Sequence, residues 1–423
     1  MSSTLLRQVT IVHTAVTDGP HDVSIVDGII REITPSIAAM GGRATERAAG
    51  DSVDVAEVVD VDVIDLAGHL LLPAAVEPHA HLDKAYLSER AVNETGDLTG
   101  AIDAMIRLGG TVGHDDIVER AERAARRMAA NGYVAVRTHV DTTEYTGVTN
   151  VAALVEVRER LIDVIDIEIV ALAGTPVVGA SGERGRALLR ECVEAGADLV
   201  GGCPHLEPDG LIDEATAIFL QIAADAGVGV DLHTDETLDP AVMGLEHLAR
   251  QVVTGFPHPV TASHCVSLGQ RSPAEQHRIA ELVAAAGIGV VTLPHTNLWL
   301  GGRDQQPVPR GLTAVAALRA AGVAVAAGAD NLQDPFNPLG RACPFETAGL
   351  MVLVAHDLPP VAWSAVSRDA RRVLGRPGGT IEVGAPADLV AVPATSLRQA
   401  IAEGPSGRRV FRAGREVTSQ ESC

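Results

Sequence analysis

The sequence predicts an α/β protein: a (β/α)8 TIM-type barrel with a small β-sandwich domain built from both ends of the chain. Three observations lead to this prediction. Eight apolar, strand-like runs recur between about residue 70 and residue 330. Segments with helical spacing, such as DDIVERAERAARRMAANG, separate these runs. Further strand-like segments lie near both termini.

The eight runs indicate a barrel because strands that alternate with helices form right-handed βαβ units and a parallel sheet. The runs begin near residues 70, 133, 167, 199, 229, 260, 288 and 322. Eight such units in about 260 residues match the size of a (β/α)8 barrel. An open doubly wound sheet is the alternative, but no GxGxxG motif follows the first strand. We therefore predict the barrel.

Both ends of the chain contain short strand-like segments. Residues 5–66 contain short β segments with Asp-Gly turn signals, and 379–393 and 408–418 repeat the pattern. The Ala/Gly/Glu-rich stretch 38–58 is expected to be a surface insertion. We therefore predict three parts: residues 1–70 as the first part of the small β-sandwich, 71–365 as the barrel, and 366–423 as a C-terminal helix and the returning strands.

Composition excludes several classes of function. The chain of 423 residues carries 33 Lys and Arg against 55 Asp and Glu, a net charge of −22, and its aromatic content is 2%. Such a charge repels phosphate backbones, and few aromatic side chains could stack on bases, so nucleic acid binding is not expected. No apolar run reaches the ~18 residues of a membrane helix.

The cellular setting follows from what the sequence lacks. We see no secretory signal at the N-terminus, and the five cysteines form no paired framework. We therefore expect a cytoplasmic protein with free thiols. The sequence carries no interface signature, so a homo-oligomer stays one alternative.

Polar residues follow the strands where a barrel enzyme keeps its active site, at the C-terminal strand ends. The first run ends in His79 and His81, which point to the same face because strand side chains alternate. The fifth, sixth and eighth runs end in His233, His264 and Asp330. Several histidines and a carboxylate around an open position suit catalytic Zn²⁺ or Fe²⁺. The alternative is a set of core histidines that only satisfy backbone groups, but so many buried polar groups are costly without partners.

The motifs VEPHAHLDK, VRTHVD, VDLHTDE, TASHC and GADNLQDPFNPLG resemble those of the amidohydrolase superfamily, specifically its cytosine-deaminase-like branch. The branch includes s-triazine amine hydrolases such as N-isopropylammelide amidohydrolase. The resemblance covers nearly the whole chain, and the motifs fall in the family's order. It implies a metal-dependent barrel with a small β-sandwich formed by both termini.

The resemblance implies roles for the polar residues at the strand ends. Glu236 matches the carboxyl that carries a proton to the substrate ring, and His264 matches the histidine that orients or deprotonates the metal-bound water, with Asp330 also accepting a proton. The family's binuclear members need a carboxylated lysine after strand four, where this chain has GGCPH. One divalent metal ion, Zn²⁺ or Fe²⁺, is therefore implied, with four ligands: His79, His81, His233 and Asp330.

The substrate pocket differs from that of cytosine deaminases. Lys84, the only lysine in the chain, matches a substrate-facing lysine of s-triazine hydrolases; an exposed surface lysine is the alternative. Gly174 stands where cytosine deaminases have a glutamine that reads the pyrimidine amide. Asn331 replaces a second Asp, and Phe336 a tryptophan that covers the substrate. Cytosine itself is therefore not the expected substrate.

Two further histidines end the second and fourth strands. His139 and His205 are expected to line the pocket or to support it, and satisfied core histidines are the equal alternative. A role in the core would leave both rings away from the substrate.

Together these features predict a mononuclear metal-dependent aminohydrolase. It would hydrolyse a C–N bond of a small nitrogen heterocycle, such as a cyclic amidine, by metal-bound hydroxide, and release ammonia or an amine. One alternative is a hydrolase that opens a cyclic amide on the same metal site. The other is a barrel that binds a small molecule without turnover.

Overall fold

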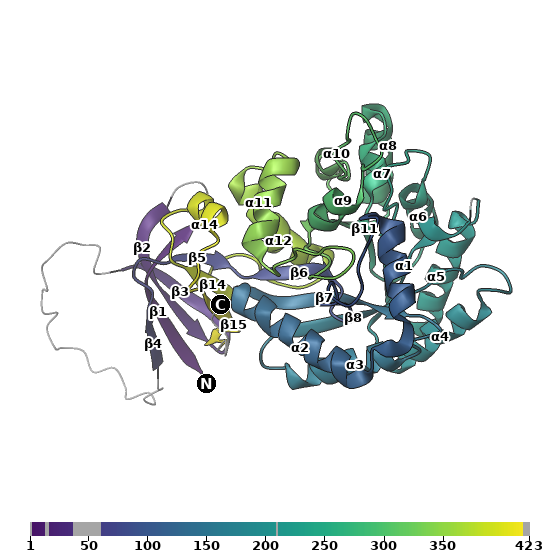
Figure 1. The fold of residues 1–423 in the computed structure, drawn as a ribbon. Coiled ribbons are helices and arrows are strands. Elements are labelled where there is room, and N and C mark those ends of the chain that lie inside the picture. Colours follow the sequence, from purple (N-terminus) through teal and green to yellow (C-terminus); the bar gives the residue numbers. More distant parts are fainter. Residues whose placement is uncertain (1, 13–16, 37–60, 209, 418–423) are drawn as a thin grey trace, which may run out of the picture.

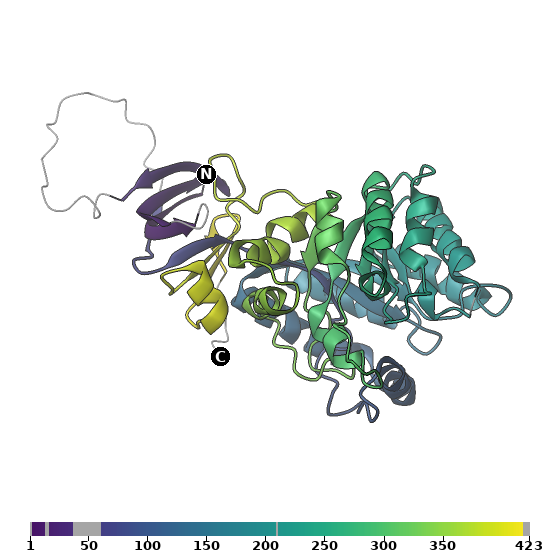
Figure 2. The same cartoon turned by 90° about the horizontal axis from the view of Figure 1, so that it is seen from above.

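The structure is a computed structural model that describes residues 2–12, 17–36, 61–208 and 210–417. Figure 1 shows a barrel surrounded by helices beside a smaller sheet, which Figure 2 shows again from above. The stretch 38–58, predicted to be an insertion, and Cys423 lie outside the described residues. No helix in the described part of the chain is long and apolar enough to cross a membrane.

Eight parallel strands form the barrel, and each pairs with its neighbours in chain order. A bridge between Ala80 and Asp330 joins the last strand region to the first, so the barrel is nearly closed. This arrangement confirms the predicted (β/α)8 fold. The strands are β6 (Ala75–Ala80), β7 (Tyr133–Thr142), β8 (Asp166–Ala173), β9 (Leu199–Gly202), β10 (Gly229–Thr234), β11 (Val260–His264), β12 (Gly289–Thr292) and β13 (Val325–Ala327).

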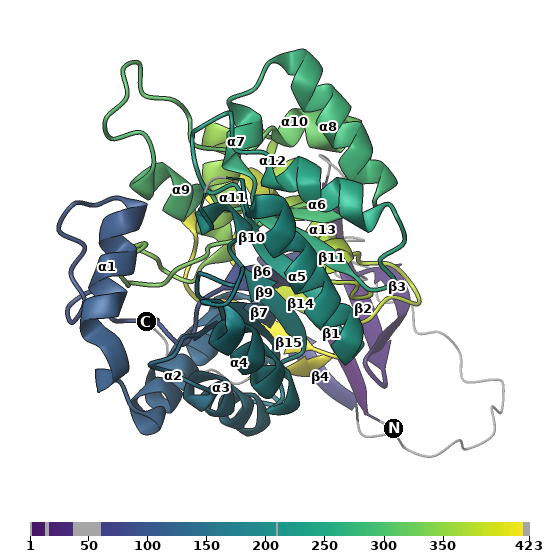
Figure 3. The same ribbon diagram turned by 90° about the vertical axis from the view of Figure 1, so that its right-hand side faces the viewer.

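Helices cover the outside of the barrel (Figure 3). Their apolar stripes pack on the strands. Helix α2, for example, buries Ile117, Ala121 and Met128, and Gly132 caps its C-terminus in the left-handed conformation. The main helices are α1 (Leu98–Leu108), α2 (His114–Asn131), α3 (Thr149–Arg160), α4 (Glu183–Glu194), α5 (Ile212–Ala226), α6 (Gly244–Val252), α7 (Val266–Gly269), α8 (Pro273–Ala285), α9 (Pro294–Leu300), α10 (Val315–Ala320), α11 (Pro344–Val354), α12 (Pro359–Val366), α13 (Arg368–Val373) and α14 (Leu397–Glu403). Short 3-10 turns cover Gly109–Thr111 and Pro204–Leu206.

The smaller sheet draws its strands from both ends of the chain, as predicted. Its hydrogen-bonded order is β16-β15-β14-β5-β1-β2-β3, with β4 paired to β1. Leu6, Ile25, Leu389 and Phe411 are fully buried or nearly so in its own apolar core. The strands are β1 (Ser3–Val12), β2 (Thr17–Val26), β3 (Ile29–Pro35), β4 (Val61–Asp65), β5 (Leu70–Pro73), β14 (Leu389–Val392), β15 (Arg409–Arg412) and β16 (Arg415–Glu416).

The run LLLPAAVEPHAH, read from the sequence as one strand, is divided between the two sheets. The N–H of Ala74 donates to the carbonyl of Asp388 in the small domain (3.0 Å), and the next N–H, that of Ala75, donates to Gly132 beside the barrel (2.9 Å). The change of partner therefore falls between adjacent residues. Of the predicted strand 379–393 only β14 forms, and the described part of the predicted strand 408–418, up to residue 417, contains the β15–β16 hairpin.

Glu77 ties the first barrel strand to the last from inside the barrel. One carboxylate oxygen accepts hydrogen bonds from the N–H of His79 (3.2 Å) and of Ala329 (3.1 Å). A side-chain Cβ at Gly328 would lie 2.6 Å from this oxygen, so the close approach requires glycine. Complete burial raises the pKa of Glu77 to about 8.

We predict that Glu77→Gln flattens the pH dependence of stability. The wild-type carboxyl holds its proton in the folded protein up to about pH 8, whereas its ordinary pKa is 4.5. The stabilisation is complete below the ordinary pKa and is lost as pH rises through the folded-state value, so the free energy of unfolding falls with rising pH. Urea unfolding between about pH 6 and about pH 9 measures the slope. The exposed Glu119→Gln on α2 should keep the wild-type slope; an equal slope in Glu77→Gln would contradict the prediction.

Candidate active site

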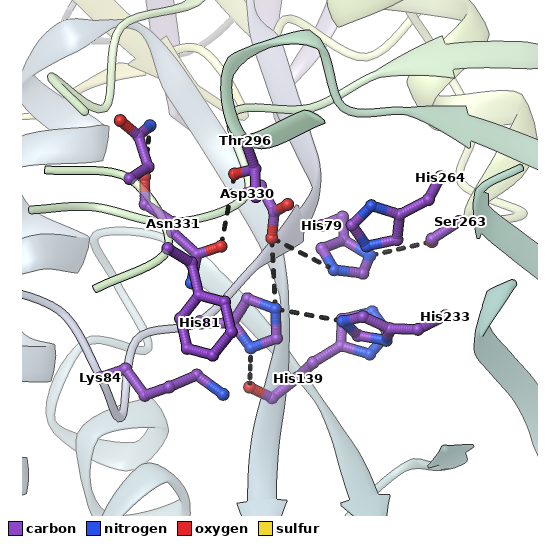
Figure 4. A network of polar contacts seen from close by, with 12 residues as sticks. His79, His81, Lys84, His139, His233, Ser263, His264, Thr296, Asp330 and Asn331 are labelled. Atoms are coloured by element: carbon purple, nitrogen blue, oxygen red, sulfur yellow. Dashed lines mark hydrogen bonds and ion pairs between the residues drawn. The ribbon is translucent and has the colours of Figure 1, made fainter. Parts of the chain in front are cut away.

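Histidine and aspartate side chains from four barrel strands converge at the C-terminal ends of the strands (Figure 4). His81 Nε2 lies 3.2 Å from Asp330 Oδ1 and 3.3 Å from His233 Nε2. His79 Nε2 lies 3.5 Å from the same Asp330 oxygen. The donor atoms of the three histidines lie within 4.8 Å of one another, as do those of His79, His264 and Asp330. The four predicted ligands are therefore brought together.

The outer nitrogens of two of these rings are already hydrogen bonded, which decides what their inner nitrogens can do. His81 Nδ1 lies 3.0 Å from the carbonyl of His139, which only accepts, so His81 Nδ1 carries the proton. Ser263 donates to Asp231 and thereby accepts from His79 Nδ1 (2.9 Å). Both rings therefore direct an unprotonated Nε2 to the centre, the form that a metal ion requires.

The electrostatics agree with a metal-ligand set. Burial lowers the pKa of His79, His81 and His233 well below the usual value, so these imidazoles are neutral at neutral pH. Burial also raises the pKa of Asp330. Nε2 of His79 and both Asp330 oxygens are buried and make no hydrogen bond within the described residues. Three imidazoles and one carboxylate with free donor atoms fit a divalent ion such as Zn²⁺ or Fe²⁺.

Glu236 and His264 lie at the edge of this ligand set. Glu236 Oε1 is 3.5 Å from His264 Nδ1, and Asn297 Nδ2 is 2.9 Å from the same nitrogen. Burial, and then the charge of Asp330, raises the pKa of Glu236 well above its usual value, whereas burial lowers the pKa of His264 to about 4. Glu236 therefore keeps its proton to a higher pH than an ordinary carboxyl does, beside an imidazole that is neutral at neutral pH.

Strained backbone places two of the side chains at the strand ends. His264 and Asp330 have φ angles of 67° and 64°, and Cys265 follows at 51°. Non-glycine residues rarely adopt this left-handed region, and such strain collects at functional sites. The neighbouring Asp235 takes no part in the ligand cluster: its carboxylate caps α6 by accepting from the N–H of Gly244 (2.8 Å) and of Leu245 (2.9 Å).

A cavity of about 510 Å³ opens above the cluster. Eight of the predicted residues line it: His81, Lys84, Gly174, His233, Glu236, His264, Asn331 and Phe336. His139 lies outside this lining, stacked on His79 at 3.8 Å between ring centroids. His205 lines an adjoining cavity of about 730 Å³, which shares Leu98, Leu206 and Glu236 with the first. The Nδ1 of His205 lies 3.1 Å from the carbonyl of His233.

Lys84 is 4% exposed and faces the cavity. Its Nζ donates to Asp141 Oδ1 (2.5 Å) and lies 5.5 Å from the centre of the Phe336 ring. Burial alone lowers the pKa of Lys84, but the carboxylates of Asp141 and Asp83 raise it above the usual value. The lysine therefore stays charged at the cavity wall.

Sequence reasoning missed the buried groups behind the ligands. Arg137 Nη1 donates to Asp231 Oδ2 (2.9 Å), and Asp231 accepts from the Ser263 hydroxyl that holds His79. Asp231 precedes His233 by two residues and so shares its face of the strand. That spacing could have identified Asp231. No comparable signal in the sequence links Ser263 to His79, because their strands are distant in the chain.

Comparison with known proteins gives three further findings. A family model described as "Amidohydrolase family" matches residues 113–417. The pterin deaminase of Rhizobium rhizogenes is 33% identical over 404 residues, covering 94% of this chain and 87% of that protein. The structure of 5-methylcytosine deaminase from Klebsiella pneumoniae, liganded with 5-fluorocytosine, superposes with a TM-score of 0.83 at 28% identity, covering 99% of this chain and 98% of its own.

The structure of N-isopropylammelide isopropylaminohydrolase from Burkholderia multivorans is also similar, with a TM-score of 0.80 and 27% identity over 99% of this chain and 98% of its own. The family that the sequence motifs predict is thus confirmed. Because the family model spans most of the chain and the pterin deaminase is similar along nearly all of it, this protein belongs to the amidohydrolase family.

Proposed function

We propose that this protein is a metal-dependent aminohydrolase that removes an amino group from a cyclic amidine in a small nitrogen heterocycle. The observation that carries the proposal is the position of Glu236, a largely buried carboxyl with a raised pKa that lies in the same cavity as the ligand cluster. The reaction needs a proton donor. Protonation of the ring nitrogen makes the neighbouring carbon easier to attack, and protonation of the amine makes it a better leaving group. A barrel that only binds its ligand needs no such group.

We propose one Zn²⁺ or Fe²⁺ ion, held by four ligands: His79, His81, His233 and Asp330. Such an ion, when bound, activates water as a nucleophile at neutral pH. A second ion bridged by a carboxylated lysine is not expected, because the only lysine, Lys84, is paired with Asp141 instead.

Side chains of the protein transfer the protons and orient the water and the substrate. Glu236 donates its proton to the ring nitrogen as water adds to the neighbouring carbon. Asp330 accepts one proton of the added water, and Glu236 carries the other to the departing amine, which leaves as ammonia or an alkylamine. The proton on Asp330 then restores Glu236. His264 is neutral, and its Nδ1 accepts from Asn297, so its Nε2–H is free to orient the water. Lys84 offers a positive charge to a carbonyl or carboxylate oxygen of the substrate.

The relatives favour a substrate with a bicyclic ring, such as pterin, over cytosine. Their names give pterin, 5-methylcytosine and N-isopropylammelide as compounds they act on, all of them nitrogen heterocycles. The pterin relative is similar along most of both chains. Gly174 lacks the side chain that the glutamine of cytosine deaminases would place in the cavity, and so it leaves space for a larger ring. A Cβ added at Gly174 would contact only Thr143, at 3.7 Å. We therefore propose a pterin-like substrate rather than cytosine.

We predict about one divalent metal ion per chain by elemental analysis, and ammonia release from pterin or a related cyclic amidine. Removal of the ion with a chelator should abolish the release, and added Zn²⁺ or Fe²⁺ should restore it. Metal without ammonia, but with a new carboxylate product, would favour the ring-opening alternative. No metal after reconstitution would contradict the ligand assignment.

We predict that Glu236→Gln lowers kcat by roughly 10²- to 10⁴-fold, as expected for the loss of a general acid, while metal content is retained. In the wild type, activity should fall on the alkaline side as Glu236 loses its proton, since only the protonated form donates. Glu207→Gln changes another buried carboxylate, one that accepts from Val177 N–H, and should retain activity. Full activity in Glu236→Gln would exclude the proposed proton transfers.

We predict that Ser263→Ala weakens metal retention by on the order of 10-fold, because His79 loses the hydroxyl that orients its ring. Competition with a chelator, followed by metal analysis, measures this without reference to turnover. Ser367→Ala removes another buried hydroxyl, which donates to the carbonyl of Trp363, and should leave metal retention unchanged. Equal retention in both variants would show that Ser263 does not position His79.

A further inference from the structure

The cavity above the ligand cluster extends well beyond its polar end. One wall of the extension is formed by Leu98, Ile102 and Met105 of α1, and other walls include Leu172 of β8 and Leu188 of α4. We call this region, defined by these five residues, the apolar arm. It belongs to the same cavity as His81, His233 and Glu236.

The α1 wall is an apolar helix face that does not pack in the core. Leu98, Ile102 and Met105 stand at positions i, i+4 and i+7 and so share one face of the helix. All three are half-buried. Within the described residues, none of them belongs to the apolar core of the barrel or packs against it. A helix face of this kind needs an apolar partner, and here it faces the cavity.

The position of α1 is set by contacts at its start. Asp97 caps the helix by accepting from the N–H of Gly100 (2.8 Å). Asn93 donates to the carbonyl of Pro335 in the loop after β13 (3.1 Å), and the Arg303 guanidinium donates to the carbonyl of Gly96. The apolar face is therefore held over the cavity by contacts with the loops that follow α9 and β13.

The size of the cavity exceeds the needs of a heterocycle alone. A bicyclic ring of roughly a dozen heavy atoms occupies on the order of 200 Å³ when closely packed. The cavity measures about 510 Å³. A ring placed beside Glu236 therefore leaves the arm unfilled.

The charges around the cavity favour an uncharged occupant. Lys84 is the one Lys or Arg among the lining residues, and Asp141 already pairs with it. Asp83 and Glu144 also line the cavity. An anionic substituent would meet more carboxylates than cations, and the arm offers it no polar partner.

We infer that the substrate is a heterocycle that carries an apolar substituent, and that the arm between α1, β8 and α4 binds this substituent while the ring lies beside Glu236. The inference rests on the proposed function and extends it by naming the substrate class. Alkyl or aryl groups on the side of the ring away from the reacting amidine fit the geometry.

The test compares pterin with a pterin that carries an unbranched propyl group on its pyrazine ring. Pteridine fluorescence reports binding to the metal-loaded protein, and ammonia release reports turnover. Each fully buried methylene strengthens binding roughly four-fold, so the propyl compound should bind at least ~10-fold more tightly. A pterin carboxylate should bind no better than pterin itself.

Two variants assign the preference to the arm. Ile102→Asp places a charge on the arm face of α1 and should reduce the propyl-to-pterin affinity ratio to about one. Arg107→Gln changes the net charge by the same amount on the exposed side of the same helix, and should keep the wild-type ratio. Met105→Gln, which adds no charge, should lower the ratio less; it decides the question if Ile102→Asp does not fold.

Each outcome has a definite meaning. Equal binding of the two pterins, or tighter binding of the carboxylate, overturns the inference. A propyl preference that survives both Ile102→Asp and Met105→Gln also overturns it, because the substituent then lies elsewhere. A preference that depends on the arm, without ammonia from either compound, supports the arm and rejects the proposed deamination.

Discussion

One backbone hydrogen bond determines the geometry of the site. The N–H of Asp330 donates to the carbonyl of His79 (3.0 Å) and thereby joins the end of the last barrel strand to the end of the first. Without this closure the aspartate and the two histidines of the first strand would lie at opposite edges of an open sheet. Glu77 reinforces the closure by holding Ala329 from below. The ligand cluster is therefore a consequence of how the barrel closes.

Closing the barrel also buries many polar groups, and this burial has an energetic consequence. A neutral imidazole costs little free energy inside a protein when its outer nitrogen is hydrogen bonded, as in His79 and His81. The buried carboxylate of Asp330, in contrast, has no Lys or Arg side chain at hydrogen-bonding distance among the described residues. A divalent ion would supply the missing positive charge. The same ion would be bound most tightly by the folded chain, since the four ligands meet only after the barrel has closed.

The sequence predicted those parts of the structure that depend on local pattern. Alternation along a single strand predicts that His79 and His81 share a face, and the family motifs single out Glu236 and Asp330 as candidate site residues. Contacts between distant strands were beyond this reasoning, as Ser263 and His79 show. The boundary at Ala74 was also hidden, because the residues on either side are equally apolar and buried, and only their hydrogen-bond partners change. The stripe on α1 likewise gives no sign of whether it meets the core or a cavity.

The proposed chemistry and the proposed specificity of this protein depend on different structural elements. The four proposed metal ligands and Glu236 lie at or just beyond the ends of strands whose positions the closed barrel determines. The arm, in contrast, takes one wall from α1, a helix within the connection between β6 and α2 that the barrel closure does not involve. On this proposal, changes in α1 alter which substituent is accepted without moving the atoms proposed to hold the metal ion or to transfer the proton. A barrel of this design separates the two tasks because connecting segments tolerate change that strands in a closed sheet do not.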